Sequence, residues 1–166
     1  MTMNGSDLQA LKVLIIEDDP DVRLGCEQAL QLEGIPTLGA ESAEAARPLI
    51  GPDFRGVVVS DIRLPRMDGM TFLREIASID PQLPVVLITG HGDVSMAVQA
   101  MKDGAHDFIQ KPFAPDHLVE VVRRALEKRR LILEVRDLRT QLAGRDQLEA
   151  RLIGNKAGME RLRQLI

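Results

Sequence analysis

Four short apolar runs in this chain of 166 residues end in side chains that can do chemistry. Glu17 and Asp18 follow the run LKVLII, and Asp61 ends VVVSD. Thr89 ends VVLIT, and Lys111 follows DFIQ. If these side chains converge, the carboxylates repel one another unless a cation lies between them. Because the acidic ligands offer only oxygen atoms and no His or Cys accompanies them, the set favours Mg²⁺.

Asp61 has the chemistry of a phosphoryl acceptor, because a carboxylate can attack a phosphoryl group and form an acyl phosphate. The ammonium group of Lys111 would supply a positive charge for one phosphoryl oxygen, and the hydroxyl group of Thr89 would donate to another. A simpler interpretation is that Asp18 and Asp19 only cap the following helix, and that Thr89 and Lys111 are ordinary strand-end residues. That interpretation leaves Asp61 unexplained, so the joint placement at four strand ends carries the prediction.

The elements that would position these residues are five apolar runs that alternate with segments of helical spacing. The runs are residues 11–16, 35–38, 57–60, 84–89 and 107–110. Strands that alternate with helices predict a parallel sheet, and runs that are apolar on both faces suit strands covered by helices on both sides. The predicted fold class is α/β, a doubly wound sheet of five parallel strands. Ligands of such a sheet bind beyond the carboxyl ends of its strands, where the reactive residues lie.

Capping and turn residues predict several element boundaries. Pro20 is expected to open the first helix and Gly34 to end it, while Ser42 and Asp93 are expected to cap the second and fourth helices. The segment Met67–Gly69 is expected to form a turn.

The last predicted helix runs from Asp116 to about Ala143 and is too long to serve the sheet alone. Its first part carries one apolar stripe, and a second stripe then continues at alternating spacings of four and three residues. The first stripe consists of Leu118, Val122 and Ala125, and the second of Leu131, Val135, Leu138 and Leu142. The second stripe predicts a coiled coil of about two heptads. The alternative is a single solvated helix packed on its own domain.

Basic residues on this helix, from Arg123 to Arg139, could indicate a nucleic-acid surface, but acidic residues alternate with them. Interleaved charges are typical of the solvated flanks of a coiled coil. The whole chain has a net charge of −4, the wrong sign for binding driven by counterion release. We therefore expect no direct DNA contact from this chain.

The composition excludes several other classes of protein. No Trp or Tyr is present to stack on bases, and the single Cys26 can form no internal disulfide. No cluster of Cys and His offers a zinc site. Residues 1–9 are polar and expected to be disordered, and no apolar run is long enough for a signal peptide or a membrane span. These features predict a cytoplasmic protein without membrane contact.

The stretches IIEDDPDVR, VVVSDIRLPRMDG, VVLITGHGD and DFIQKPF resemble those of bacterial response-regulator receiver domains over roughly residues 10–130. The resemblance implies a flavodoxin-like sheet of order 2-1-3-4-5, with Asp61 as the phospho-acceptor. Asp18, Asp61 and the backbone carbonyl of Arg63 would bind Mg²⁺, and Glu17, which replaces the commoner Asp, would act through water.

The same resemblance gives roles to residues near the phosphoryl group. Thr89 and Lys111 would contact that group, and Thr89 and Phe108 would act as the switch. For Phe108 an ordinary core position is the alternative. The family also implies a cis peptide bond between Lys111 and Pro112.

The stretches GHGDVSMAVQAMKDGAHDFIQKPF and LIGNKAGMERLRQLI resemble NtrC-type, sigma-54-dependent transcriptional activators. The resemblance implies a receiver core at 10–117, an extended helix and coiled-coil linker at 118–143, and the truncated start of an ATPase domain at 144–166. Because no GxxxxGK phosphate loop is present, this chain should not bind ATP.

The implied function is a regulatory one. A sensor histidine kinase would phosphorylate Asp61, and a homodimer would control an ATPase domain that this chain lacks. The dimer would form through the fourth helix, fifth strand and fifth helix, together with the linker. The chain would be no enzyme beyond self-phosphorylation and self-dephosphorylation.

Three other functions share parts of this pattern. A single-domain phosphorelay shuttle would have the same pocket but no use for the long helix. A Mg²⁺-dependent aspartyl phosphatase would resemble DxD, whereas Arg63 stands two residues after Asp61. A flavodoxin-like FMN binder would need a loop that accepts phosphate, whereas the loop EDDPD is acidic.

Overall fold

The computed structural model describes residues 11–90 and 94–155 and contains a single parallel sheet of five strands in the order β2-β1-β3-β4-β5. This order confirms the predicted fold class. The strands are β1 (Lys12–Ile16), β2 (Thr37–Ala40), β3 (Gly56–Asp61), β4 (Val85–Thr89) and β5 (Asp107–Gln110). β3 lies between β1 and β4, so its end is at the centre of the carboxyl edge.

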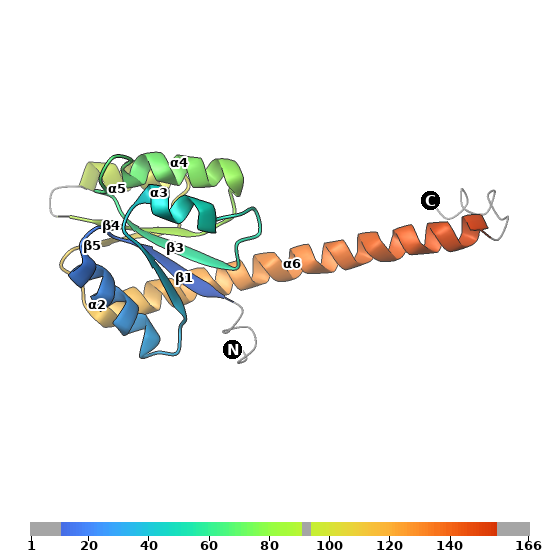
Figure 1. Ribbon diagram of the computed structural model, residues 1–166, viewed down its shortest axis with the longest axis horizontal. Coiled ribbons are helices and arrows are strands. Elements are labelled where there is room, and N and C mark those ends of the chain that lie inside the picture. The colour runs from blue at the N-terminus through green and yellow to red at the C-terminus, as the bar shows by residue number, and fades with distance from the viewer. Residues whose placement is uncertain (1–10, 91–93, 156–166) are drawn as a thin grey trace. The chain divides into compact units, whose positions relative to one another are not determined.

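Helices cover both faces of the sheet. They are α2 (Pro20–Gln31), α3 (Ala43–Ala46), α4 (Gly69–Ile79), α5 (Val94–Lys102) and α6 (Pro115–Asn155), with a 3₁₀ turn η1 (Arg47–Leu49) after α3. In Figure 1, α3, α4 and α5 lie on one face, and α2 and the first turns of α6 lie on the other. Every residue of β3 and β4 is buried, which explains why these runs are apolar without alternation.

Capping side chains start the helices at the predicted places. Pro20 is the first residue of α2, and the Ser42 hydroxyl group accepts a hydrogen bond from the Ala45 amide at 3.0 Å at the start of α3. The Asp68 carboxylate accepts from the Thr71 amide at 2.8 Å and caps α4, whose first residue is Gly69, so the turn predicted at Met67–Gly69 was wrong at its last residue. The predicted cap Asp93 lies outside the described residues, as do residues 1–9.

The predicted bounds of β2 were wrong by two residues. Gly34 has a φ of 77°, the left-handed conformation that ends a helix, and the Ile35 amide donates to the Leu30 carbonyl at 3.1 Å. Ile35 therefore completes the end of α2. Because Pro36 has no amide hydrogen, the strand begins at Thr37.

The predicted end of the last helix was also wrong, because α6 continues through Gly144 to Asn155. One glycine costs a helix only about 1 kcal/mol relative to alanine, too little to end it among good helix formers. Leu118, Val122 and Ala125 are fully buried, as their stripe predicts.

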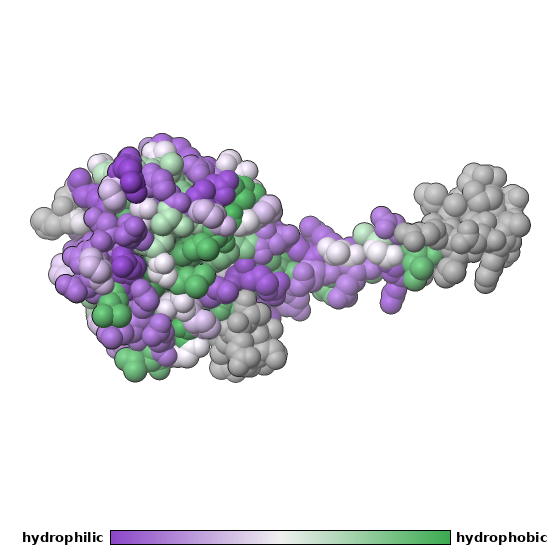
Figure 2. Space-filling view, viewed as in Figure 1, coloured by the Kyte–Doolittle hydropathy of each residue, from purple (hydrophilic) through white to green (hydrophobic). Residues whose placement is uncertain are grey.

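The chain divides into two compact units inside α6, between Leu131 and Ile132. The four residues of the predicted coiled-coil seam, Leu131, Val135, Leu138 and Leu142, are 46–55% exposed. In Figure 2 the visible face of residues 132–148 is mainly hydrophilic, with separate apolar side chains between the charges. None of the described helices is both long and apolar enough to cross a membrane. The predicted domain boundaries at 117 and 143 stay predictions.

Gly69 allows α4 to start directly against the end of β3. A Cβ atom at this position would lie 2.6 Å from the Asp61 carbonyl oxygen and 2.8 Å from the Ile62 Cα atom. We expect Gly69→Ala to lower the free energy of unfolding by about 1–3 kcal/mol, because the backbone must shift to admit a methyl group. Urea unfolding followed by circular dichroism measures this change.

Gly25 is the matched control, since it lies inside α2 and a Cβ atom there would contact nothing within 4 Å. Gly25→Ala should stabilise the protein by up to about 1 kcal/mol through helix propensity. Equal effects of the two substitutions would contradict the steric explanation.

Candidate functional site

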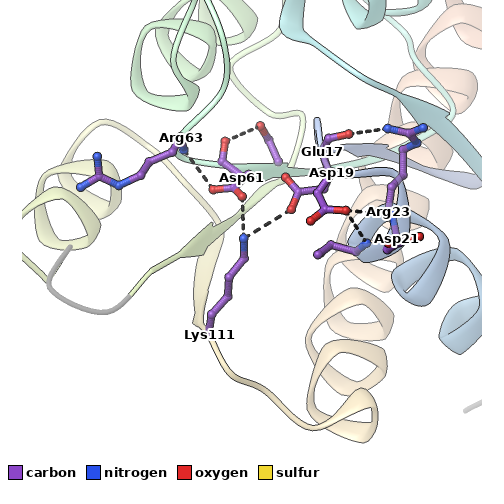
Figure 3. Close-up of polar contacts among 9 residues, drawn as sticks. Glu17, Asp19, Asp21, Arg23, Asp61, Arg63 and Lys111 are labelled. Carbon is purple, nitrogen blue, oxygen red and sulfur yellow. Dashed lines mark hydrogen bonds and ion pairs between the residues drawn. The ribbon is translucent and has the colours of Figure 1, made fainter.

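The side chains of Glu17, Asp61 and Lys111 meet at the carboxyl edge of the sheet. Glu17 follows β1, Asp61 is the last residue of β3, and Lys111 follows β5. Lys111 Nζ lies 2.7 Å from Asp61 Oδ2 and 3.4 Å from Glu17 Oε1, so one ammonium group bridges the two carboxylates (Figure 3). Three residues from distant parts of the sequence thus form a single charged pocket.

Asp61 is held on both of its carboxylate oxygens. Oδ1 accepts a hydrogen bond from the Arg63 amide at 3.0 Å, and Oδ2 accepts from Lys111. Burial alone would lower the pKa of Lys111. The hydrogen bonds and negative charges of Asp61 and Glu17 oppose this effect and raise the pKa of Lys111 above its ordinary value. Lys111 therefore keeps its positive charge beside Asp61.

Glu17 is the most buried acid of the pocket, with only 3% of its surface exposed. Its Oε2 has no hydrogen-bond partner among the described atoms. The pKa of Glu17 is raised to about 7, mainly by burial and secondly by the neighbouring Asp61. The positive charge of Lys111 opposes this rise. A buried carboxylate oxygen without a partner is unusual and indicates that a polar or cationic partner is missing at this position.

The raised pKa of Glu17 makes stability depend on pH. Between the ordinary pKa of 4.5 and the folded value of about 7, the folded protein holds a proton that the unfolded chain has released. The free energy of unfolding should therefore fall as the pH rises through this window. Urea titrations at pH 5 and pH 8 in EDTA measure the loss.

Glu17→Gln is the control, because it removes the titrating group and keeps its size. The variant should lose part of the pH dependence and be more stable than the wild type at pH 8 without divalent cations. An unchanged pH profile in the variant would show that another group is responsible.

The two aspartates after Glu17 have different positions. Asp18 is exposed, whereas Asp19 caps α2 and accepts hydrogen bonds from the Asp21 and Val22 amides at 2.9 and 3.4 Å. The helix-capping interpretation therefore holds for Asp19. It does not account for Asp18, which lies next to Glu17 at the same edge.

Thr89 and Phe108 lie on the neighbouring strands. Thr89 is buried, and its hydroxyl oxygen is 3.5 Å from the Ile109 carbonyl oxygen, a long distance for a hydrogen bond. Phe108 is 36% exposed, so the core alternative for this residue was wrong. The Lys111–Pro112 bond is cis, as the family resemblance implies.

The oxygen atoms of the pocket fit Mg²⁺. Among the side chains that the structure describes, no three of His, Cys, Asp or Glu are grouped as a metal cluster would require. Mg²⁺ does not need three, because it is usually held by one or two carboxylates together with water molecules. The partnerless Oε2 of Glu17 and the hard-oxygen chemistry of Asp18 and Asp61 therefore agree with the predicted cofactor.

Sequence reasoning missed Arg23, whose Nη1 donates to the Glu17 carbonyl oxygen at 2.6 Å. This contact ties α2 to the end of β1 and so positions the acidic loop. The signal was present, since Arg23 is the only basic residue in the stretch IIEDDPDVR.

Comparisons with known proteins agree with this geometry. Residues 13–123 match the family model described as the response regulator receiver domain. The chain is 52% identical to the C4-dicarboxylate transport transcriptional regulatory protein DctD of Pseudomonas aeruginosa, over 93% of this chain and 34% of that protein. It is 49% identical to the protein of the same name from Rhizobium meliloti, over 95% of this chain and 34% of that protein.

A solved structure with the same fold is the receiver domain of NtrX from Brucella abortus. It is 42% identical, with a TM-score of 0.67, and the match covers 70% of this chain and 98% of that one. The chain spans about a third of the length of the two DctD proteins. The sheet order, the pocket and the family match together show that this chain belongs to the response regulator receiver family.

Proposed function

We propose that Asp61 accepts a phosphoryl group from a phosphohistidine of a sensor histidine kinase, and that the acyl phosphate switches a homodimer. The observation that supports this most directly is the 2.7 Å contact between Asp61 and Lys111 at the centre of the carboxyl edge. The Asp61 carboxylate can attack phosphorus, and the ammonium group of Lys111 beside it can balance the negative charge of the transferred group.

The transfer exchanges one bond of phosphorus for another. An oxygen of Asp61 forms a bond to phosphorus while the bond between phosphorus and the imidazole nitrogen breaks. The imidazole nitrogen keeps that electron pair, and a proton from solvent leaves the histidine as neutral imidazole. Lys111 then contacts a phosphoryl oxygen rather than the free carboxylate. Arg63 holds the other carboxylate oxygen through its amide, which fixes the direction of attack.

Asp18, Asp61 and the carbonyl group of Arg63 would hold Mg²⁺, with Glu17 acting through water. The bound ion would neutralise charge on the phosphoryl oxygens. Besides the transfer from the kinase, self-phosphorylation from small donors and self-dephosphorylation are the only reactions we assign to the domain.

Thr89 and Phe108 carry the response in this proposal. The Thr89 hydroxyl group makes a long contact with the Ile109 carbonyl oxygen, so it is available to the phosphoryl group. Movement of Thr89 vacates space beside β5, and the exposed ring of Phe108 then turns inward. The surface formed by α5, β5 and α6 changes as a result. The added negative charge on Asp61 thus alters the packing of side chains around β5.

The partners follow from the family. A sensor histidine kinase supplies the phosphoryl group, and an ATPase domain beyond this chain receives the signal. Two copies pair through the surface of α5, β5 and α6 and through the linker, with no DNA contact by this chain. The exposed seam on α6 supports pairing, because a helix that exposes four large aliphatic side chains is stabilised by a partner helix.

Labelling with acetyl phosphate tests the acceptor. The chain is incubated with acetyl phosphate and Mg²⁺, the acyl phosphate is reduced with borohydride, and the modified residue is located by peptide mass spectrometry. We expect modification at Asp61 and its loss when EDTA replaces Mg²⁺. A label at another residue, or no label, would refute the proposal.

Leu138→Asp tests the linker dimer. A charge at the middle of the seam should lower the mass measured by light scattering from that of a dimer toward that of a monomer, because a buried unpaired carboxylate destabilises a coiled coil. Thr140→Asp, which lies on the same helix outside the seam, is the control and should leave the mass unchanged. A monomeric wild type would contradict this part of the proposal.

A further inference from the structure

Arg129 is a charged side chain on α6 that is 0% exposed. Its Nε and Nη2 donate to the Phe54 carbonyl oxygen at 3.0 and 2.9 Å, and Nη2 lies 2.9 Å from Asp80 Oδ2. The Asp80 side chain is itself only 3% exposed. A buried ion pair persists only while its hydrogen bonds are made, because an unpaired charge in the interior is costly. Arg129 therefore fixes α6 to two loops at once.

These two loops lead into the strands that carry Asp61 and Thr89. Phe54 lies two residues before the start of β3, and Asp80 lies in the loop between α4 and β4. Asp80 also organises its own loop, since Oδ1 accepts from the Gln82 amide at 3.0 Å. One side chain of α6 thus contacts both loops that lead into β3 and β4, and the carboxyl ends of these strands carry Asp61 and Thr89.

The two strands are stiff connections between the pocket and Arg129. β3 is hydrogen-bonded to β1 on one side and to β4 on the other, and all residues of β3 and β4 are buried. A packed interior shifts between discrete arrangements and does not deform continuously. A displacement of either strand at the pocket therefore reaches the loops that Arg129 contacts.

We propose that Arg129 is a positioning residue that ties α6 to the amino ends of β3 and β4, and that this tie carries the response of the pocket into the linker helix. The inference rests on the proposed function, since phosphorylation of Asp61 is the signal. The tie through Arg129 is a second connection between the pocket and α6, besides the proposed one through α5 and β5. Arg129 contacts the loops at the amino ends of the strands, whereas the pocket lies at their carboxyl ends. Arg129 plays no part in the phosphoryl transfer itself.

Hydrogen–deuterium exchange of the 166-residue chain tests the tie. Exchange of residues 115–131 is measured with and without acetyl phosphate and Mg²⁺, and intact mass gives the extent of phosphorylation. Arg129→Met removes the charge and its donors, whereas Asp80→Asn keeps the size of the partner, removes its charge and replaces one acceptor oxygen by an NH₂ group. Arg123→Met is the matched control, since Arg123 lies on the same helix and pairs with Glu33 at 2.6 Å in an exposed contact.

In the wild type and in Arg123→Met, phosphorylation should change the exchange of residues 115–131. In Arg129→Met and Asp80→Asn that change should be lost, while phosphorylation stays within about twofold of wild type because the substituted groups are distant from the pocket. If Arg129→Met does not fold, Asp80→Asn provides the same test.

The inference is overturned if the exchange response survives in both variants, or if a phosphorylated wild type shows no response in residues 115–131. A wild type that takes no phosphoryl group would refute the proposed function as well.

Discussion

Lys111→Met is expected to slow phosphorylation of Asp61 by acetyl phosphate by about 10²–10³-fold, the effect of removing one donor from a developing anion. Lys111 Nζ is the donor closest to Asp61 Oδ2, and Met keeps the length of the side chain without its charge. The rate is measured from the intact mass of the protein at increasing times, in Mg²⁺ at constant ionic strength.

Two further variants bracket this result. Asp61→Asn should take no phosphoryl group, which sets the zero of the measurement. Lys102→Met, which changes an exposed lysine in the last turn of α5, should leave the rate close to that of the wild type. A Lys111→Met rate within a factor of about three of wild type would remove Lys111 from the phosphoryl site.

Arg129→Met is expected to lower the free energy of unfolding by about 3–5 kcal/mol, because it leaves Asp80 as a buried carboxylate without its cation. A loss of this size is a large part of the stability of an ordinary domain. Urea unfolding at pH 7 measures it. The substitution also removes two hydrogen bonds to the Phe54 carbonyl oxygen, which adds to the cost.

Two control variants show how much of the loss in the free energy of unfolding comes from the burial of the ion pair. Arg123→Met breaks an exposed pair with Glu33 and should cost less than about 1 kcal/mol. The double variant Asp80→Leu/Arg129→Met should recover much of the lost stability, because an apolar pair of similar size often replaces a buried ion pair without loss. An equal effect of Arg129→Met and Arg123→Met would show that the Arg129 pair contributes no more than a surface contact.

The arrangement of the sheet and the place of the pocket could be predicted from the sequence. Strands that alternate with helices pair in parallel, and parallel strands end at the same edge, so Glu17, Asp61 and Lys111 had to lie near one another. Local rules also placed Pro20 at the start of α2 and Ser42 at the cap of α3. These predictions depend only on neighbours within a few residues and on the direction of the strands.

Element boundaries were less predictable where two local rules compete. Ile35 is a good strand residue, but its amide closes α2 by bonding to Leu30, so β2 starts later. Gly144 is a helix-ending signal, but its small cost is outweighed by the helix formers on both sides.

By itself the sequence determined which chemistry this protein carries and at which edge of the sheet, because both follow from residue types at strand ends. Only the tertiary structure decided the environment of each side chain. It placed Glu17 in the interior and left Asp18 exposed, although the two are neighbours in the chain. It also selected Arg129 from a run of similar basic residues, because burial of that one side chain depends on Phe54, 75 residues earlier, and on the loop at Asp80.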